Sequence, residues 1–344
     1  MIAATKTYRR PFMLLTLLMV LCLVLNISLG SVTIPFDTVW KGIFGAEIPK
    51  ASWEHIIFQY RIPKAVTALL VGSGLGVSGL LMQTLFRNPM AGPFVLGISS
   101  GASLGVAVLI MGSAGIGGVV GGVLISKWSL VIASSIGSFL VLSVVLAIAT
   151  RIRDTMTLLI IGLMFGSMTA AIVSVLAYFA PAEGIQQYVF WGFGSLGNLS
   201  WSELSVFAIV FALGVLLSVF CIKALNTLLL GENYARSLGT NLAQTRIVLI
   251  LATSLLAGSV TAFAGPIAFV GLAIPHLARL FFDTSDHKIL VPAVMVLGGC
   301  IMLLCDSIAQ MPSSVYTLPI NAITALFGAP VVIWLLVRKR KVLF

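Results

Sequence analysis

Charged residues are scarce in this chain. Lysine, arginine, aspartate and glutamate together make up 9% of its 344 residues, whereas hydrophobic residues make up 59%. Soluble domains carry roughly 25% charged residues, and the mean hydropathy here is +1.13. This composition excludes both a water-soluble globular protein and a disordered chain.

Common catalytic and metal-binding motifs are also missing. No Gly-x-x-x-x-Gly-Lys-Ser/Thr sequence is present to hold ATP phosphates, and neither Gly-x-Ser-x-Gly nor His-Glu-x-x-His occurs. His55, His276 and His287 do not have the spacing of metal ligands, and the four cysteines lie in apolar segments. We therefore expect no enzyme activity, no metal site and no cofactor bound by this chain.

Acidic residues are nearly absent from the apolar segments. Of the ten aspartates and glutamates, only Asp306 stands at the end of an apolar segment among apolar neighbours. Ion-coupled carriers generally keep ionisable groups within the membrane as relays. A secondary transporter is therefore the weaker alternative, and energy for uphill transport would have to come from outside the chain.

Apolar runs near 20 residues long recur along the whole sequence, each long enough to cross a hydrocarbon layer about 30 Å thick. Backbone groups inside lipid must be satisfied internally, and continuous apolarity does not fit the alternating pattern of a barrel. We predict an all-α polytopic membrane protein, with one domain over 1–344. About ten spans are expected, at roughly 12–30, 65–85, 93–111, 129–149, 156–179, 201–222, 246–264, 266–281, 289–305 and 318–337.

The distribution of basic residues predicts the orientation. Ten spans place both termini on one side, and fifteen of the twenty lysines and arginines fall on that side. By the positive-inside rule both termini are cytoplasmic, so the positive charge is a topology signal with an anionic-lipid component and not a nucleic-acid footprint. The fifteen are Lys6, Arg9, Arg10, Arg87, Arg151, Arg153, Lys223, Arg236, Arg246, Arg279, Lys288 and Arg338 to Lys341, and the other five are Lys41, Lys50, Arg61, Lys64 and Lys127.

One cytoplasmic loop, about 223–245, is longer than a turn requires. The segment from Glu232 to Leu238 can form about two helical turns, and Gly239 suits the left-handed residue that ends a helix. Asn241, followed three residues later by Gln244, resembles the start of another helix.

Two interpretations of this loop remain open. Tyr234, Ala235 and Leu238 would share one helix face, at the spacing of a helix that enters a groove on another protein. The loop is then a docking element. The alternative is an ordinary solvated loop.

Glycine and proline interrupt two of the predicted spans. Gly97 and Gly101 stand in the third span, and Gly265 with Pro266 opens the eighth. Irregular backbone at membrane depth is tolerated where it lines a cavity, and broken helices in both halves are typical of transporters. Close helix packing is the alternative for small residues, and it is the main interpretation of four glycines in the second span: Gly72, Gly74, Gly76 and Gly79.

Several of these segments resemble, over nearly the whole chain, the FecCD-type permeases of bacterial ABC importers for iron-siderophore, haem and vitamin B12. Each match is weak alone, but their order and spacing are specific. The matching segments are Arg61-Ile-Pro-Lys64, Ser78-Gly79, Gln83, Arg87-Asn-Pro-Met-Ala, Gly97-Ile-Ser-Ser-Gly-Ala102, Trp191-Gly-Phe-Gly-Ser-Leu196, Gly231 to Gly239, Gly265 to Leu272, Pro275-His276, Asp306 and Leu318 to Pro330.

The resemblance implies an architecture and a set of partners. The expected fold is that of a type II ABC importer permease in the bacterial cytoplasmic (inner) membrane. A second permease copy would form a homodimer, or a similar permease would complete the pair, with the path along the dimer axis. Two ABC ATPase subunits would dock inside, holding ATP and magnesium, and a substrate-binding protein would dock outside.

The resemblance also assigns roles to residues. Glu232, Asn233, Tyr234, Ala235, Arg236, Ser237, Leu238 and Gly239 look like the helix that couples to the ATPase. Glu232 and Arg236, four residues apart, would pair either with each other or with the ATPase. Arg61 and Lys64 look like partners for carboxylates of the binding protein, or else interfacial anchors. Gln310 stands where the family often has arginine, which weakens the docking interpretation there.

A cytoplasmic gate is implied at Asn88, Met90, Thr155 and Met156. Family members commonly have leucine in place of Met90 and a small hydroxyl residue in place of Met156, so this gate would be softer and more apolar and could close by dewetting. Asn321 replaces a usual glycine, for which the sequence suggests no reason.

The cargo stays open. The resemblance favours an iron complex, a ferric siderophore or haem, and vitamin B12 is the alternative within the same family. A membrane scaffold without transport would leave the helix breaks and the loop without a role.

Overall fold

The computed structural model describes residues 8–113, 126–149, 151–152, 155–197, 199–311 and 316–337, and these residues form helices and connecting loops without a strand. Among the described residues, seven helical stretches are long and apolar enough to cross a membrane, and three shorter apolar helices accompany them. The all-helical prediction with about ten spans is confirmed. Lys6, Arg153 and Arg338 to Lys341, on which the topology prediction partly depends, lie outside the described residues.

The spanning helices follow the predicted order. In the first half they are α1 (Arg9–Ser28), α4 (Ile62–Leu85), α5 (Ile98–Ser113), α7 (Lys127–Ala149) and α8 (Thr155–Phe179). In the second half they are α10 (Trp201–Phe220), α13 (Leu242–Thr253) continued through η4 (Ser254–Gly258) into α14 (Ser259–Ala264), α15 (Val270–Phe282), α16 (His287–Ala309) and α17 (Ile320–Val337).

The largest departure from the predicted boundaries is at the second span. The helix begins well before residue 65, because α3 (Ala51–Ile56), the π-helical turn η1 (Ile57–Arg61) and α4 form one stretch of 35 residues. Pro63 lacks an N–H, and the wider turn just before it accommodates this without ending the helix. Two shorter helices, α2 (Phe36–Ile43) and α9 (Ala182–Gly192), were not predicted.

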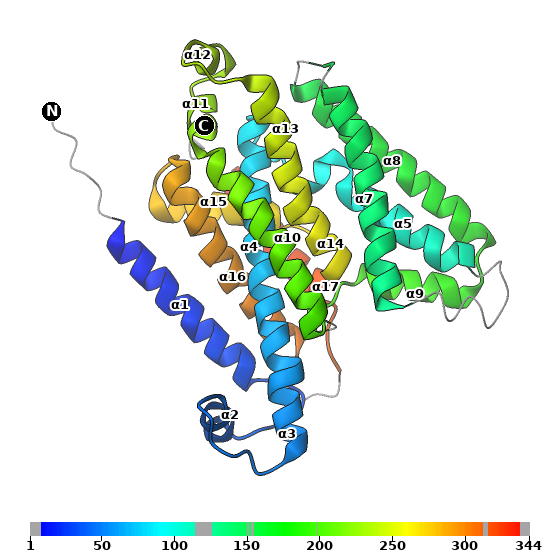
Figure 1. Cartoon of the computed structure of the whole chain (residues 1–344), viewed down its shortest axis with the longest axis vertical. Helices are drawn as coiled ribbons and strands as arrows, with labels where there is room; N and C mark the ends of the chain where they lie inside the picture. Colours follow the sequence, from blue (N-terminus) through cyan, green and yellow to red (C-terminus); the bar gives the residue numbers. More distant parts are fainter. Residues whose placement is uncertain are drawn as a thin grey trace.

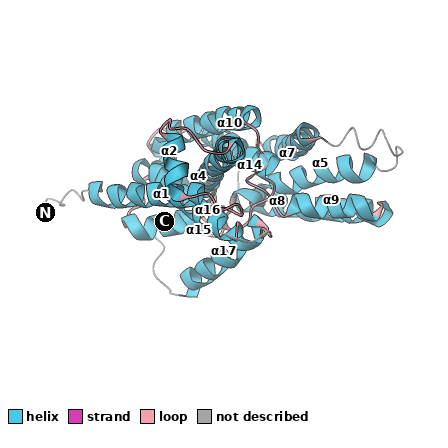
Figure 2. Cartoon of the chain, turned by 90° about the horizontal axis from the view of Figure 1, so that it is seen from below, coloured by secondary structure: helices cyan, strands magenta, loops and turns pink. Residues whose placement is uncertain are grey.

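Helix α4 lies at the centre of the bundle, and almost all of its side chains are buried. Its glycines allow neighbouring backbones to touch: a Cβ on Gly72 would collide with the carbonyl of Gly298 in α16, and one on Gly79 with Gly271 in α15. The packing interpretation is confirmed for Gly72, Gly76 and Gly79, whereas Gly74 faces side chains at ordinary contact distances. Helices α5, α7, α8 and α9 form a second group beside this core, as Figures 1 and 2 show.

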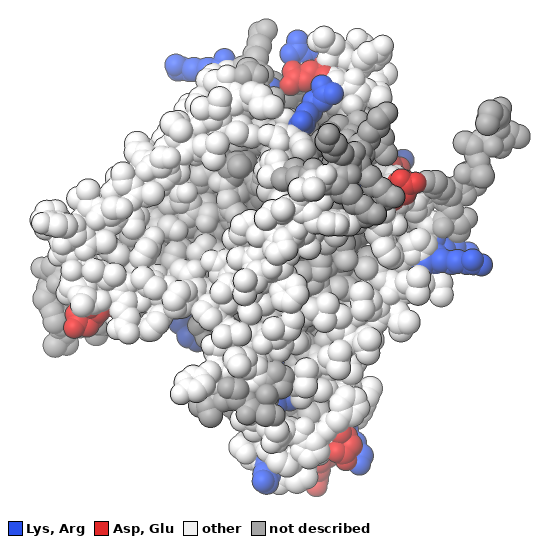
Figure 3. All heavy atoms as spheres, turned by 180° about the vertical axis from the view of Figure 1, so that it is seen from behind, with Lys and Arg blue, Asp and Glu red and all other residues white. Residues whose placement is uncertain are grey.

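Charge is arranged as a membrane protein requires. Most of the charged side chains in Figure 3 lie toward the two ends of the molecule, and the broad surface between them is mostly uncharged. Large apolar side chains of α1, α8 and α10 are exposed along this middle zone. We call the end that carries the 223–245 loop the inner end, after the predicted orientation, and the end that carries α2 and α3 the outer end.

Candidate functional site

The inner-end loop contains the predicted short helix. After α11 (Ile222–Leu228), α12 (Glu232–Ser237) stands at the tip of the molecule (Figure 1). Gly231 and Gly239 have φ values of 104° and 81°, which non-glycine residues rarely adopt. The Asn241 side chain accepts a hydrogen bond from Gln244 N–H at 3.1 Å and begins α13 as predicted. Helix α12 is therefore bounded at both ends by specific local geometry.

The outward face of α12 differs in one residue from the predicted face. Tyr234 and Leu238 are 68% and 59% exposed, but Ala235 is 0% exposed and packs inward. Ala235 is one residue, about 100°, around the helix from Tyr234, so it lies on the boundary of the face and the sequence spacing does not fix its direction. The apolar side chains that α12 offers to a partner are therefore those of Tyr234 and Leu238, without Ala235.

Glu232 lies between two arginines. Its carboxylate is 4.0 Å from Arg236 of the same helix and 3.8 Å from Arg246 of α13. Arg246 also donates a hydrogen bond to the carbonyl of Ile152 at 2.8 Å, so the base of α12 is connected to the segment before α8. The pair within the helix forms, and Arg246 is an additional partner that the sequence did not indicate.

A group of polar side chains connects α11 to the core. His287 Nδ1 and Asn226 Oδ1 are 2.7 Å apart, and His287 Nε2 is 2.8 Å from the hydroxyl of Thr84 in α4. Asn226 also donates to Asp286 at 2.7 Å. We call these four residues the inner clamp. No sequence pattern predicts the inner clamp, since its members lie up to 203 residues apart.

Hydrogen bonds orient the His287 ring and hold Asp286 ionised. Asn226 Oδ1 accepts from the backbone N–H of His287 at 2.9 Å, and because an amide oxygen only accepts, the ring Nδ1 that lies 2.7 Å from it is a donor. Burial acts to raise the pKa of Asp286, but hydrogen bonds from Lys288 N–H and Asn226 outweigh it and hold that pKa below its ordinary value.

The predicted gate residues lie at the inner ends of α4 and α8. Asn88 Oδ1 accepts from Met90 N–H at 2.9 Å, which forms a turn, and His276 contacts the carbonyl of Pro89 at 2.8 Å. Met90 and Met156 are exposed, and Thr155 begins α8. The role of these residues as a gate stays a prediction.

Two of the predicted helix breaks are present, and one is not. Gly97 has φ of 75° after the short helix η2 (Pro93–Leu96), and Gly265 with Pro266 separates α14 from α15. Gly101 lies inside α5, where it packs against Gly137 of α7. The expectation of a break at Gly101 is therefore wrong, because a small residue there allows close helix contact.

At the outer end, the two basic residues predicted to dock a partner face inward. Arg61 is 4% exposed and donates to the carbonyls of Ile27, Ser28 and Val32 at 2.9, 2.9 and 2.6 Å. Lys64 is 7% exposed and lies 3.1 Å from the carboxylate of Asp306 in α16. Their role in docking stays a prediction, but in this conformation both charges are satisfied within the chain.

Asp306 is the centre of this outer group. Its second carboxylate oxygen accepts from Asn26 of α1 at 2.9 Å and from Gln310 at 2.8 Å. We call Lys64, Asp306, Asn26 and Gln310 the outer clamp. Gln310 supplies a neutral donor at a position where the FecCD-type permeases that the sequence resembles often have arginine. The Asp306 carboxylate does not need a second positive charge, because Lys64 already neutralises it.

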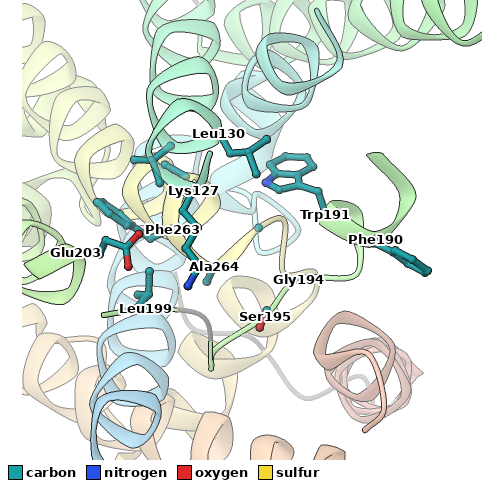
Figure 4. A pocket seen from close by; sticks show the side chains of 13 residues that line it. Lys127, Leu130, Phe190, Trp191, Gly194, Ser195, Leu199, Glu203, Phe263 and Ala264 are labelled. Atoms are coloured by element: carbon teal, nitrogen blue, oxygen red, sulfur yellow. The ribbon is translucent and has the colours of Figure 1, made fainter. Parts of the chain in front are cut away.

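A hollow opens near the outer end between α7, the turn after α9 and the end of α14. Its lining includes Lys127, Trp191, Glu203 and Phe263, and its volume is about 110 Å³. Lys127 and Glu203 point into this space from different helices (Figure 4). A second hollow of about 230 Å³ lies beside the outer clamp.

Comparison with known proteins shows to which family the chain is similar. Residues 17–338 match the FecCD transport family. The vitamin B12 import system permease protein BtuC of Klebsiella pneumoniae is 37% identical over 335 residues, covering 96% of this chain and 95% of that protein. The hemin transport system permease protein HmuU of Yersinia pestis is 32% identical over 336 residues, covering 96% and 97%.

Two solved structures share the fold. One, described as an inward-facing conformation of a metal-chelate type ABC transporter, has a TM-score of 0.81 at 30% identity and covers 97% of this chain and 100% of that one. PsaBC from Streptococcus pneumoniae, in complex with Fab, has a TM-score of 0.50 at 15% identity over 82% of this chain and 93% of that one. The second likeness shows the fold alone.

The fold and the sites define a polytopic membrane subunit of a transporter, with no phosphate-binding motif of its own. The chain belongs to the FecCD transport family. It is a multi-pass permease subunit of a bacterial ABC importer, not itself an ATPase. As such a subunit it binds no cofactor, because ATP is bound by the partner ATPase.

Proposed function

We propose that the chain is the permease of an importer that moves an iron complex, a ferric siderophore or haem, across the bacterial cytoplasmic membrane. The observation that carries the transport role is α12, a short helix held at the inner end with Tyr234 and Leu238 exposed. The likeness to a hemin permease and to a metal-chelate type transporter supports the iron complex.

The partners follow from the same arrangement. Two ATPase subunits bind α12 and its copy in a second permease, and closure of the ATPases displaces the helix. The ion pairs from Glu232 to Arg236 and Arg246 hold α12 as a unit, so a push on its tip reaches α13. A binding protein delivers the cargo to the outer end, and Asn88, Met90, Thr155 and Met156 close the path inside.

Vitamin B12 is the second candidate cargo, because the BtuC proteins are up to 37% identical to this chain among the relatives compared. Uptake into proteoliposomes that contain the permease, its ATPase and its binding protein separates the candidates. We expect ATP-dependent uptake of ⁵⁵Fe-siderophore or haem that excess cobalamin does not compete away. Labelled cobalamin entering instead would overturn the iron assignment while leaving the transport role intact.

The ATP-driven role has its own test. Replacing Glu232 to Leu238 with a Gly/Ser linker should abolish uptake while the permease still reaches the membrane. Uptake that persists in this variant, or that stops when an ion gradient is collapsed with ATP present, would favour a secondary transporter.

A further inference from the structure

Three segments that the proposed function does not use meet near the outer end. They are the turn after α9, the interruption between α14 and α15, and the first turn of α17. Ser195 N–H donates to the carbonyl of Ala264 at 2.9 Å, and a Cβ on Gly265 would lie 2.9 Å from the carbonyl of Trp191. The turn and the interruption therefore pack backbone to backbone.

Asn321, in the first turn of α17, forms hydrogen bonds with the other two segments. Its side-chain oxygen accepts from Ala268 N–H at 3.0 Å, and its side-chain nitrogen donates to the carbonyl of Gly192 at 3.4 Å. Its backbone N–H, one of the first in α17 and without a partner inside that helix, donates to the carbonyl of Phe193 at 3.2 Å. The polar groups of one residue thus connect α17 to both neighbours.

The interruption requires such a contact. Phe269 has φ of 63°, a strained value for a residue other than glycine. Strained backbone persists only where the surroundings hold it. Two residues of α17 do so: Asn321 binds the preceding residue, and Gly328 leaves the room that the Phe269 side chain occupies.

The turn after α9, the interruption between α14 and α15 and the first turn of α17 together line the two outer hollows, and we call these three segments the outer wall. Gly194 and Ser195 line both, Gly265 lines the hollow of Figure 4, and Ile320 lines the hollow beside Lys64 and Asp306. Moving the wall would change the shape of both spaces together.

We propose that Asn321 is a positioning residue of the transport cycle. Its hydrogen bonds make the turn after α9, the interruption and the start of α17 move together at the outer end of the transport path. The inference rests on the proposed transport function. It also gives a role to an asparagine that stands where resembling permeases usually have glycine.

The test measures exposure of Ser195→Cys to a membrane-impermeant maleimide in cells that carry the full chain with its ATPase. The four native cysteines are buried and provide a low background. Asn321→Ala should increase the labelling rate about three- to tenfold, because one or two hydrogen bonds no longer hold the wall. ATP-driven uptake of haem or ferric siderophore per permease should fall, while affinity for the binding protein should not change.

Thr324→Ala is the matched control. Thr324 donates to the carbonyl of Asn321 within α17 at 3.1 Å, whereas the hydrogen bonds to Ala268 and Gly192 are made by the Asn321 side chain, so labelling and uptake should match the parent. Asn321→Asp, nearly the same size, keeps the acceptor for Ala268 and should give intermediate labelling even if the alanine variant folds poorly.

Equal labelling in all three variants, with uptake per molecule unchanged, would overturn the inference and leave Asn321 a purely structural residue. Absence of ATP-driven uptake by the parent chain would instead remove the proposed function. The labelling comparison needs no cargo, so the two failures are distinguishable.

Discussion

The two ends of α4 are both tied to α16, but by different chemistry. At the outer end the tie is a buried ion pair, Lys64 with Asp306. At the inner end it is a pair of neutral groups, Thr84 with His287. Between them the two helices touch through Gly72 and Gly298.

The difference indicates which end can adjust. Separating a buried ion pair leaves charges in a medium that solvates them poorly, so the outer clamp holds its geometry strongly. A neutral hydrogen bond costs far less to exchange. The inner clamp also reaches Asn226 of α11, which leads to the exposed helix α12. We expect motion driven by a partner to enter at the inner end while the outer end of α4 stays fixed to α16.

The largest effect is expected from breaking the outer clamp on one side. Asp306→Ala leaves Lys64 buried without its partner, and the free energy of unfolding should fall by about 3–5 kcal/mol. Thermal unfolding of the detergent-solubilised permease, followed by its intrinsic tryptophan fluorescence, measures this loss.

Removing both charges provides the control. Lys64→Met with Asp306→Leu should come within about 1–2 kcal/mol of the parent, because no charge is then stranded. A double variant as unstable as Asp306→Ala would mean that the hydrogen bonds lost by Asn26 and Gln310, and not the stranded charge, determine the loss.

The second largest effect is expected on binding of the ATPase to α12 and not on folding. Tyr234→Ala and Leu238→Ala remove exposed side chains from α12, so the unfolding temperature should not change. If these side chains fill a pocket of the ATPase, each variant should weaken ATPase binding by about 2 kcal/mol or more. Co-purification and surface plasmon resonance with the isolated ATPase measure the effect, with Asn233→Ala as an exposed neighbour in the same helix. Unchanged binding in both variants would remove α12 as the docking element.

The sequence predicted the spans well because each depends on a local quantity, the length of an apolar run. The breaks at Gly97 and Gly265 were predicted for the same reason, since glycine and proline act where they stand. What could not be predicted was the direction of charged side chains beside an apolar helix. Lys64 turns inward because Asp306, 242 residues later in the chain, is there to receive it.

The inner clamp and the contacts of Asn321 were missed for a related reason. Thr84, Asn226 and His287 are common residue types in separate segments, and no spacing marks them as neighbours. Asn321 was noticed only as a departure from a pattern. Its partners, Ala268 and Gly192, use backbone groups, which carry no sequence signal at all.

The third prediction weakens the inner clamp. His287→Ala removes a buried ring between Thr84 and Asn226, so the free energy of unfolding should fall by about 1–3 kcal/mol. Because the clamp joins α11 to α4, transport per ATP hydrolysed should fall more than stability does. Measuring ATPase activity and uptake in the same proteoliposomes gives this ratio, and Thr84→Val, which removes only the hydroxyl, should lower it less. An unchanged ratio in both variants would show that the inner clamp is only a packing feature.

The smallest effect is expected at Glu232. Its two ion pairs, at 4.0 and 3.8 Å, are partly exposed, and such pairs contribute about 0.2–1 kcal/mol each before screening by salt. Arg246→Ala should lower the free energy of unfolding more than Arg236→Ala does. Arg246 is buried and also binds the carbonyl of Ile152, whereas Arg236 is exposed. A double-mutant cycle with Glu232→Gln, measured once as unfolding and once as ATPase binding, separates the roles. A coupling between Glu232 and Arg236 that appears in unfolding and vanishes in binding means that the pair serves only α12. Loss of ATPase binding in Arg236→Ala beyond that coupling means that Arg236 contacts the partner directly.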